Sequence, residues 1–144
     1  MLKKKAITAG LTVGLFSVVG VSAAAEEEAP AEGNLTNTRY VELKPSFVTN
    51  FGVSDSGHLR YIKADVSVRV ESTNAEYAVR YHQPALRDVM VLLLSRQDES
   101  TVSSAAGRET IKAEAVQELR AILEQEEGEG FIEDLLFTNF IVQR

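Results

Sequence analysis

The sequence predicts a small α+β domain in which helices cover one face of an antiparallel sheet. Strand-like segments stand near both ends of the region after residue 40, and two helical patterns lie between them. The expected order of elements is therefore strand, strand, helix, helix, strand. A chain of 144 residues has room for one such domain and a short appendage.

Charge and composition exclude several classes of function. The chain has 15 basic and 21 acidic residues and a formal net charge of −6. Residues 1–25 contain three lysines and no acidic residue, so the rest of the chain has 12 basic and 21 acidic residues and a charge of −9. Proteins that bind nucleic acid use clustered Lys and Arg on the phosphates, so we expect no nucleic-acid partner. The absence of cysteine excludes disulfides and thiolate zinc sites.

Residues 1–25 have the layout of a secretory signal peptide. Three lysines precede an apolar run from Ala6 to Val21, and Ala23-Ala24-Ala25 offers an exit with cleavage after Ala25. A retained membrane anchor is the alternative, but a run of about 16 residues spans only about 24 Å of a hydrocarbon core of about 30 Å. In both cases the rest of the chain lies across the membrane from the cytoplasm.

Residues 26–39 separate this segment from the domain. They are rich in Glu and Ala and contain almost no large apolar side chain. Such a composition buries too little surface to offset the entropy cost of ordering, and its like charges repel one another. We interpret the segment as a flexible acidic linker, followed by a domain of residues 40–144.

The first half of the domain predicts two strands joined by a hairpin loop. Residues 40–51 are β-rich but contain Pro45, which favours an edge strand or a bend, with the strand itself at residues 46–51. Turn-forming residues 52–57 predict the loop. Residues 62–71 alternate between apolar side chains and charged or polar ones, which is typical of a half-solvated antiparallel strand.

Two helical patterns follow. Residues 74–96 have apolar side chains at spacings of three and four, and Pro84 predicts a break or kink at Gln83. Residues 97–107 are polar and predict a loop or a frayed first turn, and a second helix is expected from about Arg108 to Glu126. The acidic last turn of that helix opposes the helix dipole. We interpret it as a solvated surface, with a functional surface as the alternative.

The closing segment, residues 131–143, is the most apolar and aromatic stretch of the domain. Its apolar side chains occupy both parities of a strand pattern, which favours a strand covered on at least one full face. We expect this strand to be a main contributor to the core, through Leu135, Phe137, Phe140 and Ile141. On that interpretation Phe137→Ala costs about 3–5 kcal/mol of stability.

No pattern of catalytic or metal-binding residues is present in the sequence. His58 and His82 are the only histidines, and they do not share a metal-ligand spacing. The chain has no glycine-rich phosphate loop, no nucleophile elbow and no cysteine nucleophile. We therefore expect no enzyme, no cofactor and no metal. A small secreted hydrolase would require a buried set of Ser, His and carboxylate that the sequence does not indicate.

A partner-binding surface is easier to name. Tyr77, Arg80, Tyr81 and Arg87 place aromatic and arginine side chains close together on the first helical pattern. These residue types are enriched at protein interfaces. The alternative is that Tyr77 and Tyr81, four residues apart, pack on the sheet.

Several segments carry a resemblance to a known family. They are Pro45 to Asn50, the alternating strand from Arg60 to Glu71, Leu86-Arg87-Asp88 with Val91 to Ser95, Gly107-Arg108-Glu109, and the closing residues Leu136 to Gln143. The last of these is the most specific. Over about Tyr40 to Gln143 the chain resembles the flagellar basal body-associated FliL family.

The resemblance implies a periplasmic domain similar to the stomatin/prohibitin type that forms rings, a homo-oligomer close to the membrane. It further implies partners in the flagellar motor stator and basal body, support of flagellar rotation in swimming or swarming, and neither catalysis nor a cofactor. FliL proteins usually begin with a cytoplasmic stub and a full transmembrane helix. The shorter run here favours a soluble periplasmic relative, with an anchor in the inner membrane as the alternative. A general periplasmic or membrane-associated scaffold with a non-flagellar client is the alternative function.

Overall fold

The structure is a computed structural model that describes residues 37–52 and 57–144. The expected signal peptide at residues 1–25, most of the acidic linker at 26–39 and the middle of the loop at 52–57 lie outside the described residues.

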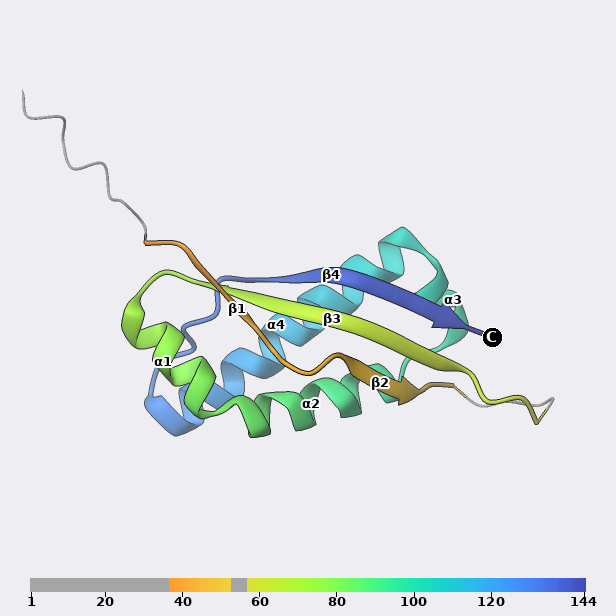
Figure 1. The fold of residues 1–144 in the computed structure, drawn as a ribbon, viewed down its shortest axis with the longest axis horizontal. Helices are drawn as coiled ribbons and strands as arrows, with labels where there is room; N and C mark the ends of the chain where they lie inside the picture. The colour runs from red at the N-terminus through yellow and green to blue at the C-terminus, as the bar shows by residue number, and fades with distance from the viewer. Residues whose placement is uncertain (1–36, 53–56) are drawn as a thin grey trace, which may run out of the picture. The chain divides into compact units, whose positions relative to one another are not determined.

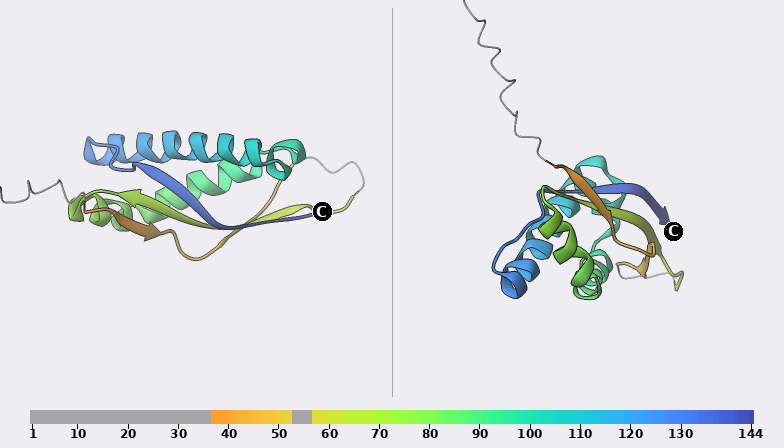
Figure 2. Two further views of the ribbon diagram at one scale, coloured as in Figure 1. Left: turned by 90° about the horizontal axis from the view of Figure 1, so that it is seen from above. Right: turned by 60° about the vertical axis from the view of Figure 1, so that its left-hand side comes forward.

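The described chain forms a four-stranded antiparallel sheet with helices packed against one face (Figures 1 and 2). The elements, in chain order, are β1 (Arg39–Glu42), β2 (Phe47–Asn50), β3 (Tyr61–Val70), α1 (Thr73–Tyr81), α2 (Gln83–Ser95), α3 (Glu99–Ser103), α4 (Ala105–Glu127) and β4 (Asp134–Gln143). The predicted α+β class with an antiparallel sheet is confirmed. The predicted order of elements is wrong in detail, because the described residues contain three strands before the helices and four helices.

Pro45 accounts for the additional strand. It lies in the bend between β1 and β2, after a cis peptide bond from Lys44. Both strands pair with the same edge of β3, β2 along its first half and β1 along its second half. β2 corresponds to the strand expected at residues 46–51. β1 escaped prediction because its four residues, RYVE, contain a single buried side chain, which is too short a pattern to recognise.

β3 is the central strand of the sheet. β4 pairs with its other edge from Tyr61↔Gln143 to Arg69↔Asp134. The side chains of β3 that face the helices are fully buried, as the alternating pattern predicts; they are Ile62, Ala64, Val66, Val68 and Val70. On its opposite face Lys63 is exposed. The central position that the sequence suggested for the closing strand therefore belongs to β3.

β4 is an edge strand with a β-bulge, and its second edge pairs with no other strand of the described chain. The register places Phe137 opposite Val66 and Asn139 opposite Asp65, so Thr138 is the additional residue. The inward face therefore changes from Leu135 and Phe137 before the bulge to Phe140 and Val142 after it. Because the inward face changes at the bulge, apolar side chains stand at both odd and even positions of this segment.

The bulge corrects the expected core of the closing strand. Leu135 is fully buried, whereas Phe137 and Phe140 are partly buried against the core. Ile141 pairs with Lys63 on the outer face of the sheet and is 46% exposed. Its assignment to the core was wrong, because a strand that gains one residue turns every later side chain to the other face.

The helices begin and end at recognisable caps. Ser72 caps α1 by accepting a hydrogen bond from the amide of Ala75, and the chain breaks at His82, one residue before the predicted position. The stretch expected as a loop contains the short helix α3, capped by Asp98. α4 begins at Ala105, three residues earlier than expected, because Ser104 caps it.

Gly107 lies in the corner between α3 and α4. A Cβ atom at this position would lie 2.0 Å from the carbonyl oxygen of Thr101, closer than any real contact. Only glycine allows the two helices to meet at this distance. α4 then ends at Glu127, where Gly128 adopts a left-handed conformation with φ of 81°.

We expect Leu135→Ala and Ile141→Ala to differ strongly in their effect on stability. Leu135→Ala removes a fully buried side chain and should cost about 2–5 kcal/mol, whereas Ile141→Ala on the outer face should cost about 1 kcal/mol or less. Phe137→Ala should fall between them, because this side chain is only partly buried. Urea unfolding monitored by circular dichroism measures these differences. Equal costs for Leu135→Ala and Ile141→Ala would contradict the bulged register.

Candidate functional site

Three of the four predicted interface residues lie on α1. Tyr77 and Tyr81 are 66% and 67% exposed, and their rings stack with centroids 6.1 Å apart. The ring of Tyr81 also contacts His82 edge to face. The alternative that these tyrosines pack on the sheet is wrong. They form an exposed pair of aromatic rings. Tyrosine is among the residue types that contribute most of the binding energy at protein interfaces.

Arg80 is held beside this pair by an ion pair. Its guanidinium donates to Glu76 at 2.9 Å, and Arg39 of β1 donates to the other carboxylate oxygen at 2.8 Å. The hydrogen bonds from Arg80 and then Arg39 lower the pKa of Glu76 below its ordinary value of 4.5. Glu76 therefore stays ionised at neutral pH, connects α1 to β1, and orients Arg80 at the surface.

Arg87, the fourth predicted residue, connects α2 to the bend between β1 and β2. Its Nη1 atom donates to the carbonyl oxygens of Leu43 and Pro45, at 3.2 and 2.5 Å. The guanidinium carbon lies 4.3 Å from the centroid of the Phe47 ring. Arg87 thus has a structural role that the sequence did not indicate, because its acceptors are backbone carbonyls more than forty positions away in the chain.

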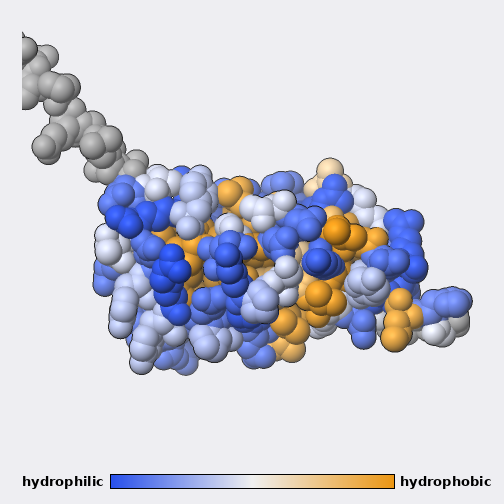
Figure 3. All heavy atoms as spheres, viewed as in Figure 1, coloured by the Kyte–Doolittle hydropathy of each residue, from blue (hydrophilic) through white to orange (hydrophobic). Residues whose placement is uncertain are grey.

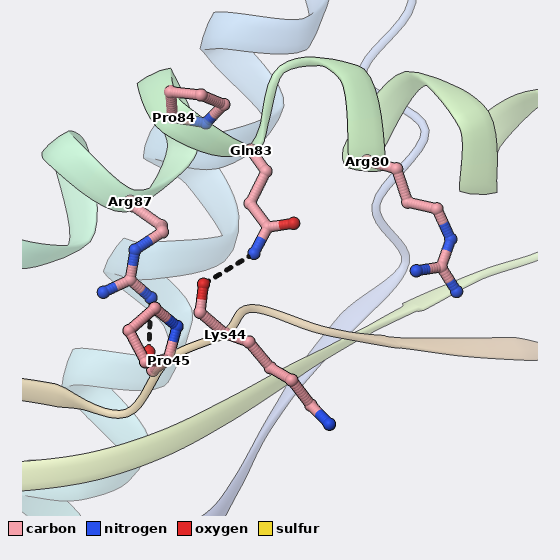
Figure 4. A pocket seen from close by; sticks show the side chains of 6 residues that line it. All are labelled: Lys44, Pro45, Arg80, Gln83, Pro84 and Arg87. Atoms are coloured by element: carbon pink, nitrogen blue, oxygen red, sulfur yellow. Dashed lines mark hydrogen bonds between the residues drawn. The ribbon is translucent and has the colours of Figure 1, made fainter.

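The bend and the junction of the two helices enclose a groove, which we call the elbow groove (Figure 4). It has a volume of about 510 Å³ and is lined by Lys44, Pro45, Arg80, Gln83, Pro84 and Arg87. The side-chain amide of Gln83 donates to the carbonyl oxygen of Lys44 at 2.9 Å and so fixes one wall. Three of the lining residues are cationic and none is acidic.

A second hollow adjoins the elbow groove. It has a volume of about 340 Å³, and its lining adds Tyr40 and Glu42 to Lys44, Arg80 and Gln83, which both hollows share. The two hollows therefore lie side by side at the bend and α1. The sequence prediction found Arg80 and Arg87 of this lining but missed Lys44 and Gln83. Each missed residue is next to a proline that marks a bend, and that was the available signal.

The outer face of the sheet carries separate apolar side chains. Val48 is 62% exposed and Leu136 37% exposed, and in the register Val48 and Ile141 lie on either side of Lys63. Figure 3 views this face and shows hydrophobic patches between hydrophilic residues. Most single exposed apolar residues need no explanation, but here several share one open sheet face.

The described residues contain no group of three or more His, Cys, Asp or Glu that could hold a metal ion. His82 instead bonds through Nε2 to Glu127 at 2.6 Å, so part of the acidic last turn of α4 has a structural partner at the α1–α2 junction. Among residues 37–52 and 57–144, none of the helices combines the length and the apolar composition that crossing a membrane requires.

We expect the two arginines of the groove to respond differently to truncation. Arg87→Ala removes a charged donor from two carbonyls and should lower the free energy of unfolding by about 1–3 kcal/mol. Arg80→Ala breaks only an exposed ion pair within one helix and should leave stability nearly unchanged. Chemical denaturation of both variants measures this contrast. A larger loss for Arg80→Ala than for Arg87→Ala would refute the structural role of Arg87.

The comparison with known proteins covers the whole sheet-and-helix unit. The family model described as "Flagellar basal body-associated protein FliL" matches residues 40–143. A relative named "Flagellar protein FliL", from Aquifex aeolicus (strain VF5), is 25% identical over 102 residues, which cover 71% of this chain and 60% of the relative. The match thus spans less than two thirds of the relative's length. The chain belongs to the FliL family, a family of flagellar basal body-associated proteins and not of enzymes.

Proposed function

We propose that this protein interacts with the stator of the flagellar motor and supports flagellar rotation in swimming or swarming. The observation that carries the proposal is the family match across residues 40–143, which takes in every strand and helix except the first residue of β1. The matched relative is longer than the match. The names of the family and of the relative do not mention the stator, so the stator as partner is proposed here.

The proposal includes the organisation of the chain. Residues 1–25 act as a cleaved signal peptide, residues 26–39 as a flexible acidic linker, and residues 40–144 as a periplasmic domain near the membrane. Retention of the N-terminal segment as an anchor in the inner membrane is the alternative. In this scheme the domain resembles the stomatin/prohibitin type and assembles into a homo-oligomeric ring. The exposed apolar side chains on the outer sheet face, such as Val48 and Ile141, support self-association.

The surface around α1 supports a separate contact with the partner. Tyr77 and Tyr81 present two stacked aromatic rings, and Arg80 lies one residue before Tyr81 on the same helix. Tyr and Arg are enriched among the residues that dominate binding energy.

We expect a strain that lacks the gene to swim or swarm less well, and complementation by Tyr77→Ser/Tyr81→Ser to restore motility only in part. Both side chains are exposed, so the double variant should fold normally. Leu59→Ser is the matched control, because Leu59 is also a large, exposed apolar side chain. Leu59 lies before β3 in the chain and not on α1. Swarm diameter and swimming speed under load are the measurements.

Two outcomes would overturn the proposal. One is unchanged motility in the deletion strain under load. The other is a pulldown that captures the same partners from motile and non-flagellated cells, which would indicate a general scaffold with a non-flagellar client.

A further inference from the structure

We propose that the elbow groove binds an extended, acidic segment of a partner protein. The inference rests on the proposed function, since it specifies which kind of segment the proposed partner presents. It concerns a surface formed by two bends of the chain, at Pro45 and at Pro84.

The lining of the elbow groove is positively charged. Lys44, Arg80 and Arg87 line the groove without any acidic residue, although the chain as a whole has a net charge of −6. The sign of the charge in the groove is therefore opposite to the sign of the net charge of the protein. A concave surface lined by one sign of charge focuses its field and attracts the opposite charge.

The three cations of the groove can accept a carboxylate from a partner. Arg87 donates to two neutral carbonyls, so its charge is not neutralised by its hydrogen-bond acceptors. Lys44 pairs with Glu42, and Arg80 with Glu76, in exposed ion pairs. Exposed pairs contribute little net free energy, so an incoming carboxylate can compete for Lys44 and Arg80.

The size and chemistry of the lining also suit a chain segment. The elbow groove has a volume of about 510 Å³ and shares Lys44, Arg80 and Gln83 with the adjoining hollow, so it has room for an occupant larger than a compact ion. Pro45 and Pro84 supply apolar contact area. The side-chain N–H of Gln83 donates to the carbonyl oxygen of Lys44. The side-chain oxygen of Gln83 can then accept a hydrogen bond from the backbone N–H of a bound segment.

The distribution of acidic residues around the groove favours a protein segment over an anionic membrane. Glu42 lines the adjoining hollow, Glu76 lies beside Arg80, and Glu127 lies beside His82. A flat anionic surface would approach these carboxylates and be repelled. A narrow segment that enters the groove can replace Glu42 and Glu76 at Lys44 and Arg80, one carboxylate for another, and does not have to approach Glu127.

Fluorescence anisotropy with a labelled peptide tests the inference on the purified full chain. The probe is a 12-residue peptide of alternating Glu with Pro or Ala, and the control probe has Gln in place of each Glu. We expect the acidic probe to bind, to release as salt increases, and to lose affinity about tenfold in Lys44→Gln/Arg80→Gln. The matched control, Lys63→Gln/Arg96→Gln, removes the same net charge from residues outside the groove lining and should retain the wild-type affinity.

Equal binding of both probes, or equal loss in both double variants, would overturn the inference. So would binding to vesicles that contain phosphatidylglycerol, if it depended on Lys44 and Arg80 while the acidic probe failed to bind. The assay does not involve motility, so its failure is distinguishable from failure of the proposed function. Probe binding at the groove in a protein whose deletion leaves motility intact would overturn only the motor role.

Discussion

The pairing of β3 with strands on both of its edges is the interaction on which the rest of the domain depends. β1, β2 and β4 each pair with β3 and with no other described strand. The same strand presents five fully buried side chains to the helices. Glu42 pairs with Ser67 and Phe47 with Ala64, so the chain between β1 and β2 has two more residues than the facing part of β3 and bends at Pro45. That bend supplies one wall of the elbow groove. The candidate site is thus a consequence of the sheet topology.

Local signals in the sequence were sufficient for the elements that depend on neighbouring residues. The alternation of β3 was predicted correctly, and the break between α1 and α2 and the end of α4 were each predicted to within one residue. The bulge in β4 was not predictable, because one additional residue, Thr138, has no signature of its own and merely makes the pattern look apolar on both faces. That ambiguity led to the overestimate of Ile141 as a core residue and of β4 as the centre of packing.

The candidate site could be predicted from the sequence only in part. Residue type alone selected Tyr77, Arg80 and Tyr81, and the structure places all three at the surface; their contact with a partner stays a prediction. It could not assign the structural role of Arg87 or include Lys44, since the contacts between the bend and α2 join residues about forty positions apart. The prolines indicate where the chain bends, but they do not indicate which bends come together in the fold. The elbow groove forms only because two such bends lie next to each other.

We expect a partner at the flagellar basal body to contact the elbow groove. Photo-crosslinking in motile cells, with a photoreactive residue in place of Gln83 and a control in place of Lys63 on the outer sheet face, measures that contact. The crosslink at position 83 should capture a basal body protein through a peptide rich in Asp or Glu, as identified by mass spectrometry. Capture of that protein from position 63 and not from position 83 would contradict it.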